Sequence, residues 1–204
     1  MKPERHAKRL LDLQDLLVNF SEIERLIYMP DGKHTDRKET DTEHSYNLAI
    51  LAWYLCGSFP HLDRDKVIRY ALMHDMVEIH AGDVMAIGRT AEQQATKDER
   101  EAEALNQLKS EWPDFSDMTD TIEEYEEQKD PEAVFVKALD KITPMMLQIL
   151  SNGKTWKKYD ILRSEVIQLK DEKTAPSKEV NEIWHVFREQ ILAHDDWFKT
   201  DKAD

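Results

Sequence analysis

Residues 67–83 read VIRYALMHDMVEIHAGD and join an apolar helical pattern to a group of ionisable side chains. His74 and Asp75 are adjacent, and Glu78 follows about one helical turn later along the same edge. A glycine then ends the pattern, so Asp83 is expected to turn back toward these groups. Buried ionisable groups are costly unless they are paired or bind a metal, which makes this stretch a candidate functional site.

Two other apolar segments carry ionisable residues of the same kind. His44 stands just ahead of the apolar run at residues 48–51, and Asp140 lies within an apolar helix. Each has a structural alternative, because a histidine at a helix start is often a surface or capping group. Asp140 would likewise be satisfied by ion pairs with Lys137 and Lys141.

Together these residues form a plausible metal-ligand set. Two imidazoles and two carboxylates supply nitrogen and oxygen ligands that suit a divalent first-row ion, with positions left for water and a substrate oxygen. A further carboxylate beside such a site can hold or deprotonate a water molecule.

Helical spacing recurs along nearly the whole chain and predicts an all-α bundle. We expect one domain over residues 1–204, with the site in a core of about 15–165. Residues 29–42 contain Pro30 and Gly32 and are expected to be a loop, with Thr42 as the N-cap of the next helix. About seven helices are expected, over residues 8–28, 43–58, 64–80, 91–111, 117–128, 132–151 with an interruption at Pro144, and 177–198.

Composition and charge restrict the class of partner. The 204 residues include only 5 Gly and 7 Pro, which argues against a disordered or many-turned chain. A net charge of −14 disfavours polymeric nucleic acid and anionic membranes. The longest charge-free stretch, residues 48–60, is shorter than the roughly 20 apolar residues of a membrane span. One cysteine and an N-terminus without an apolar core lead us to expect a cytoplasmic protein.

The order and spacing of the ionisable residues resemble the signature of the HD-domain metal-dependent phosphohydrolases. The similarity extends over about residues 15–165 and is greatest to the branch of bacterial 5'-deoxynucleotidases and their eukaryotic HD-domain relatives. The residues that carry it are Glu43-His44-Ser45, His74-Asp75 with Glu78 and Gly82-Asp83, and Lys137-Ala138-Leu139-Asp140.

This resemblance implies a role for each residue of the signature. One divalent ion (Mn, Co, Fe, Ni, Zn or Mg) would be bound by His44, His74, Asp75 and Asp140. Glu78 and Asp83 would be the catalytic carboxylates beside the attacking water. A single ion is expected because no histidine lies between residues 80 and 140.

Four basic residues are candidates for binding the phosphate of a substrate. The resemblance implies an arginine ahead of the first histidine, followed by an aromatic residue. Arg25 occupies that position but is followed by Leu26, and Arg37 is a second candidate. Arg89 and Lys137 lie close in sequence to the proposed ligands, although Arg89 would otherwise be a solvated loop residue and Lys137 a neutraliser of the nearby aspartate.

The expected function is the hydrolysis of a small nucleotide, most directly a (deoxy)nucleoside 5'-monophosphate. Within this class, hydrolysis of (deoxy)nucleoside triphosphates or of another small phosphate ester is the alternative. Outside it, the alternatives are a metal- or nucleotide-binding module without turnover and a structural bundle that uses the ion only for stability. Tryptophan-bearing helices and the family resemblance also suggest a homodimer.

Overall fold

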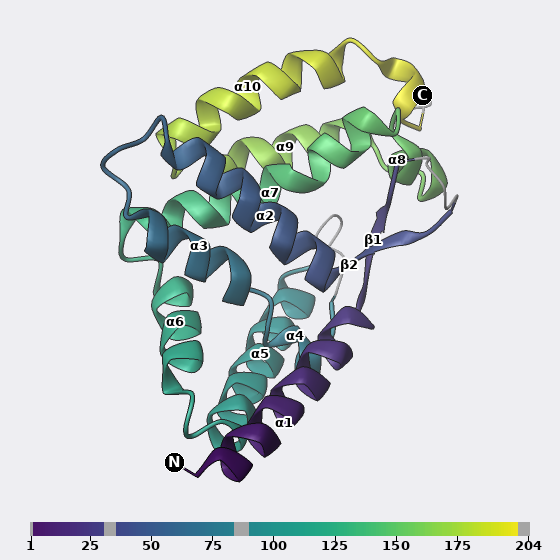
Figure 1. Ribbon diagram of the computed structural model, residues 1–204. Coiled ribbons are helices and arrows are strands. Elements are labelled where there is room, and N and C mark those ends of the chain that lie inside the picture. Colours follow the sequence, from purple (N-terminus) through teal and green to yellow (C-terminus); the bar gives the residue numbers. More distant parts are fainter. Residues whose placement is uncertain (1, 31–35, 84–89, 200–204) are drawn as a thin grey trace.

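The structure is a computed structural model that describes residues 2–30, 36–83 and 90–199, and its architecture is helical (Figure 1). The prediction of an all-α fold is confirmed, apart from a two-stranded antiparallel sheet near the N-terminus. No helix in the described ranges is long and apolar enough to cross a membrane. The elements are α1 (Pro3–Ser21), β1 (Glu24–Tyr28), β2 (Lys38–Thr40), α2 (Asp41–Cys56), α3 (Arg64–Met73), α4 (Glu78–Ala81), α5 (Ala91–Glu111), α6 (Ser116–Glu127), α7 (Pro131–Leu150), α8 (Lys154–Lys158), α9 (Arg163–Thr174), α10 (Lys178–Leu192) and a 3-10 turn (Asp195–Trp197).

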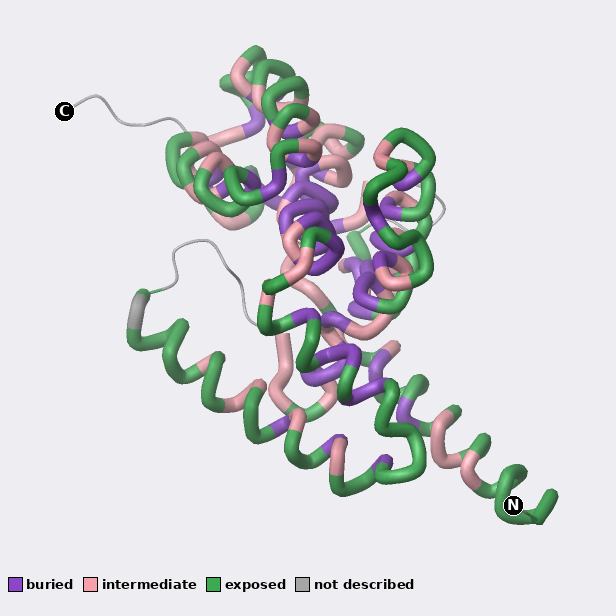
Figure 2. Tube along the Cα trace, turned by 90° about the vertical axis from the view of Figure 1, so that its left-hand side faces the viewer, coloured by how far each residue is buried: buried purple, intermediate pink, exposed green. Residues whose placement is uncertain are grey.

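Two apolar clusters hold these elements together. The larger one surrounds α7, whose side chains Leu139 and Ile142 are fully buried against α2, α3, α9 and α10. The smaller one joins α1, α4, α5 and α6 through Phe20, Leu108 and Ile122. Figure 2 shows the buried segments gathered in the middle of the molecule, whereas the outer turns of α1 near the N-terminus are exposed.

The predicted first helix is too long. α1 ends at Ser21, and residues 24–28 form β1, which pairs with β2 through Glu24↔Thr40 and Tyr28↔Lys38. A short apolar run fits a helix and a strand equally well, so spacing alone does not separate the two. The consequence for the site is that Arg25 lies on a strand beside the start of α2.

The cap of α2 is Thr40 and not Thr42. The Thr40 side chain accepts a hydrogen bond from the backbone N–H of Glu43, and the Glu43 carboxylate accepts one from the backbone N–H of Thr40. This reciprocal pair is a capping box, which starts the helix two residues earlier than predicted. It also gives Glu43 a structural role as part of the cap of α2.

The predicted third helix is broken near the candidate site. α3 ends at Met73, and the chain continues through turns in which Met76 N–H donates to Met73 O and Glu78 N–H donates to Asp75 O. Such three-residue turns are tighter than an α-helix, and they lead into the short α4. Gly82 then ends α4 with a φ of 73°, in agreement with the predicted helix end.

The helices from α7 to α10 also differ from the sequence-based expectation. α7 continues through Pro144 without an interruption, and α10 ends at Leu192. The helices α8 and α9 were not expected at all. Many residues of α9 are charged, so its apolar pattern is too short to predict a helix from the sequence. The helix is stabilised by its packing against α7 and α10.

The capping box of α2 is testable. Thr40→Ala removes the acceptor for the Glu43 N–H, so we expect the free energy of unfolding to fall by about 1 kcal/mol in urea titrations. Thr42→Ala, on the exposed face two residues later, serves as the control and should change stability by less than about 0.5 kcal/mol. A larger loss at Thr42 than at Thr40 would contradict this assignment of the cap.

Candidate metal centre

The four side chains proposed as metal ligands converge from three parts of the fold. His44 lies on α2, His74 and Asp75 lie in the turn after α3, and Asp140 lies on α7. His44 Nε2 is 2.9 Å from Asp140 Oδ1, and His74 Nε2 is 3.0 Å from Asp75 Oδ2. The cross distances are 4.0 Å from His44 Nε2 to Asp75 Oδ2 and 3.9 Å from His74 Nε2 to Asp140 Oδ1. All four atoms therefore surround one small volume.

The orientation of His74 suits a metal ligand. Its Nδ1 lies 3.0 Å from the carbonyl oxygen of Ala71, which places the ring proton on Nδ1 and leaves the lone pair on Nε2. That Nε2 is buried and makes no hydrogen bond with the described residues, although it faces Asp75 and Asp140. An unsatisfied buried nitrogen aimed at two carboxylates fits a bound cation.

Arg25 is tied to the same group by ion pairs. Its Nη1 is 2.7 Å from Asp75 Oδ2 and 3.0 Å from Asp41 Oδ1, and its Nε is 3.6 Å from Glu39 Oε2. Burial would lower the pKa of the guanidinium, but Asp75 and the other nearby acids outweigh it and the pKa is raised. Arg25 is thus a permanent positive charge that holds Asp75 in place.

Glu78 lies beside Asp75, and the charge of Asp83 acts on Glu78. Carboxylate oxygens of Asp41, Asp75 and Glu78 lie within 4.8 Å of one another. Burial, together with the charges of Asp75, Asp83 and Asp41, raises the pKa of Glu78 well above its ordinary value. Lys97 Nζ on α5 lies 3.6 Å from Glu78 Oε1. The geometry therefore places two further acids beside the proposed ligands.

The crowding of acids also affects the imidazole of His44. Burial and the Arg25 charge lower its pKa, but hydrogen bonding to Asp140 and Glu39 outweighs both and raises the pKa to about 9. For Asp41, burial and the Asp75 charge raise the pKa to about 6. Both pKa values are raised by nearby carboxylates, whose negative charge a bound cation would offset.

A pocket of about 630 Å³ opens onto the centre. His74, Asp75 and Asp140 form part of its wall, together with Tyr125 of α6 and residues of α5 and α9. Five lysines also line it, namely Lys97, Lys137, Lys141, Lys170 and Lys173. Sequence reasoning singled out only Lys137. Lys170 follows Val166 by four residues and so lies on the same helical face, which is the pattern that could have indicated its burial. The helix itself was not predicted, so this pattern was not used.

The four candidates for phosphate binding are placed differently. Arg25 lies in the centre, and Lys137 lies at the pocket with its Nζ 3.3 Å from Glu126 Oε2. Arg37 is not part of the pocket wall and forms a two-pronged ion pair with Glu43, with both distances 2.7 Å. Arg89 lies outside the described residues.

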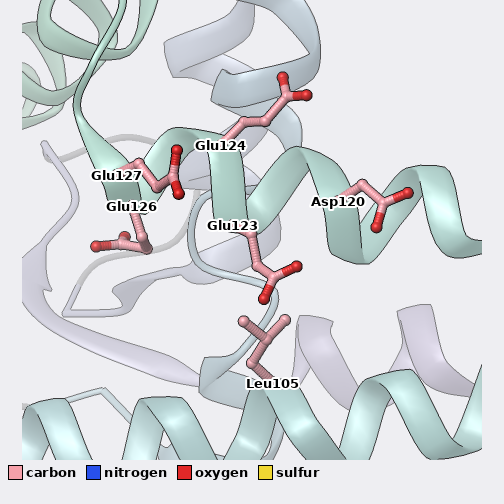
Figure 3. A pocket seen from close by; sticks show the side chains of 6 residues that line it. All are labelled: Leu105, Asp120, Glu123, Glu124, Glu126 and Glu127. Atoms are coloured by element: carbon pink, nitrogen blue, oxygen red, sulfur yellow. The ribbon is translucent and has the colours of Figure 1, made fainter.

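A second pocket, on α6, has a different character. Its wall consists of Leu105 and the carboxylates of Asp120, Glu123, Glu124, Glu126 and Glu127. Figure 3 shows these carboxylates pointing in different directions from the helix, without a common centre. All five are exposed, so this acidic part of α6 is a solvated surface.

Comparison with known proteins agrees with the resemblance found in the sequence. The model of the HD domain family matches residues 30–184. The 5'-deoxynucleotidase HDDC2 of Bos taurus is 32% identical over 146 residues, which cover 71% of this chain and 68% of that protein. The Xenopus laevis protein of the same name is also 32% identical and covers 71% and 69%.

Two solved structures share the fold. A predicted metal-dependent phosphohydrolase from Magnetospirillum magnetotacticum superposes with a TM-score of 0.75 and 26% identity, covering 94% of this chain and 99% of that one. A conserved hypothetical protein from Pyrococcus furiosus superposes with a TM-score of 0.62 at 21% identity and therefore supports the fold alone.

The metal centre is testable by loss of one ligand. His74→Ala removes the unsatisfied Nε2, so the affinity for Mn²⁺ or Co²⁺ should fall by about tenfold or more in calorimetric titrations. A chelator should lower the melting temperature of the unchanged protein, but not that of the variant, because a ligand stabilises only the state that binds it. His80→Ala is the control, since His80 pairs with Glu111 at 3.2 Å. Equal metal affinity in both variants would exclude this ligand set.

Proposed function

We propose, because this chain belongs to the HD-domain family of metal-dependent phosphohydrolases, that it removes the phosphate from (deoxy)nucleoside 5'-monophosphates. The observation that carries the proposal is the convergence of His44, His74, Asp75 and Asp140 on one small volume, with the Glu78 carboxylate close to that of Asp75. The name 5'-deoxynucleotidase, which several relatives share, supports the monophosphate as substrate.

One divalent ion would be held by His44, His74, Asp75 and Asp140 in this proposal. Such mixed nitrogen and oxygen ligands accept Mn, Co, Fe, Ni, Zn or Mg. When bound, the ion supplies a polarised phosphoryl oxygen and a water of lowered pKa. The second acidic group, formed by Asp41, Asp75 and Glu78, already has Arg25 and Lys97 as its cations.

Glu78 is the proposed proton carrier. Hydrolysis of a phosphate monoester forms a bond from water oxygen to phosphorus, breaks the bond to the 5'-oxygen, and moves one proton from the water to the departing alcohol. Glu78 is buried beside Asp75, and its Oε2 makes no hydrogen bond with the described residues. A carboxylate in this position can take that proton and return it. Asp83, whose charge acts on Glu78, would hold the attacking water, while Lys97 keeps the Glu78 side chain in place.

The walls around these groups separate them from bulk water. His44, His74 and Asp140 are almost fully buried, and the pocket opens onto His74, Asp75 and Asp140. The ring of Tyr125 packs edge-on against His74 at 5.9 Å and covers one side of the centre. In such surroundings, charged groups interact more strongly than in water.

The proposal is tested by a screen of nucleotides for product release. We expect inorganic phosphate from 5'-monophosphates in the presence of Mn²⁺ or Co²⁺, and its loss with His74→Ala. Release of pyrophosphate or triphosphate from nucleoside triphosphates would support the triphosphohydrolase alternative instead. Nucleotide binding without any turnover would support a binding module.

The role of Glu78 has a separate test. Glu78→Gln keeps the shape of the side chain but cannot accept the proton, so kcat should fall by about 100-fold or more while metal affinity stays within about twofold. Glu103→Gln, on the exposed face of α5, is the matched control. Full activity of the Glu78 variant would remove its proposed role.

We also propose that the protein is a cytoplasmic homodimer. On α2, Tyr46, Ile50 and Trp53 follow one face and are 62%, 44% and 52% exposed, so Trp53 is no core residue. A stripe of large exposed apolar side chains is typical of an interaction surface, and a two-fold axis would place it against itself. The single cysteine, Cys56, is free and buried, which is consistent with a reducing compartment.

The dimer is testable by light scattering. Trp53→Glu places a charge in the proposed interface, so the measured mass should fall by about half relative to the unchanged protein. Val186→Glu, at a 61% exposed apolar residue on α10, is the control and should leave the mass unchanged. A monomeric unchanged protein would contradict the dimer.

A further inference from the structure

The lysines of the catalytic pocket differ in whether their charge is balanced. Four of the five have acidic partners. Lys97 pairs with Glu78 and Glu101, Lys137 with Glu126, Lys141 with Asp140 at 2.5 Å, and Lys173 with Glu172 at 3.0 Å. The ammonium of Lys170 makes no hydrogen bond or ion pair with the part of the chain that the structure describes.

Lys170 is also the most buried of the five pocket lysines. It is only 5% exposed, yet it lines the pocket together with His74 and Asp140. Burial, with the charges of Lys141 and Arg25, lowers the pKa of its amine to about 7, while Asp140 acts in the opposite direction. A buried ammonium without a partner is unfavourable, and a bound anion would remove that cost.

The position of Lys170 is set by its helix. α9 packs against α7, which carries Asp140, and against α10. The fully buried Val166 lies one turn before Lys170, and the hydroxyl of Thr174 donates to the Lys170 carbonyl oxygen at 2.8 Å. The packing of α9 therefore holds the backbone of Lys170 beside the pocket that this residue lines.

Arg25 is not the cation that would bind the phosphate of the substrate. Its guanidinium is already paired with Asp75, Asp41 and Glu39, and it is mostly buried by them. A phosphate dianion entering a site rich in carboxylates needs a cation that is not yet neutralised. Among the described basic residues of the centre and pocket wall, Lys170 meets this condition.

We propose that Lys170 binds the phosphate of the nucleotide substrate from the α9 side of the pocket. The proposal rests on the proposed phosphohydrolase function and adds the residue that recognises the phosphate. Lys170 is a substrate-binding residue in this assignment, and it takes no part in the proton transfer.

The test compares Lys170→Met with the unchanged protein in the presence of Co²⁺. Loss of a charge-assisted hydrogen bond should raise the KM for 5'-monophosphates by roughly tenfold to a hundredfold and weaken competitive inhibition by inorganic phosphate to a similar degree. kcat should change much less. Lys170→Arg retains the cation and should recover most of the affinity for phosphate. Lys178→Met removes the same charge from an exposed position outside the pocket and should leave KM unchanged.

Stability and metal affinity separate a binding role from a structural one. Because methionine fills a similar volume without a buried charge, Lys170→Met should unfold at the same temperature as the unchanged protein or at a higher one. Its Co²⁺ affinity, measured by calorimetry, should be unchanged.

The outcomes distinguish this inference from the proposed function. Normal KM and phosphate inhibition in Lys170→Met, with turnover intact, would overturn the role of Lys170 and leave the phosphohydrolase standing. Lysine-dependent binding of inorganic phosphate in a protein that hydrolyses no nucleotide would support the anion site and overturn the proposed reaction.

Discussion

The buried negative charge around Asp75 is the constraint on which the rest of the structure depends. Asp75 lies against His74, Arg25 and His44, and its neighbours Asp41 and Glu78 add two more carboxylates. Removing so many acids from water is unfavourable unless each has a cation or a hydrogen-bond donor. The arrangement of the basic residues, and the affinity for a metal ion that we propose, follow from this requirement.

The fold meets the requirement by bringing charge from separate elements to one place. α7 is buried on nearly every side, so the Asp140 carboxylate lies within the core. β1 exists mainly as a short pairing with β2, yet it brings Arg25 to the start of α2 and to the turn after α3. The break after Met73 has a similar effect. The tight turns that follow it bring the carboxylates of Asp75 and Glu78 close together.

The pocket has two chemically different sides. Among the described residues near the centre, the acids outnumber the cations, and Arg25, Lys97 and Lys141 are already paired with them. On the α9 side, Lys170 is buried and has no acidic partner within the described ranges. A substrate with an anionic end and a neutral end would find unlike surroundings at the two sides. This asymmetry connects the packing of α9, far along the chain, with recognition at the centre.

The sequence by itself determined the helical character of the chain and the set of ionisable residues that form the centre. Both are readable because helical periodicity is local, and because a histidine or aspartate within an apolar helix is unusual wherever the helix lies. Only the tertiary structure decided that residues 24–28 form a strand, that Arg25 is neutralised by three acids, and that Lys170 belongs to the pocket. These features arise from contacts between segments distant in the chain, and such contacts leave no periodic signal in either segment.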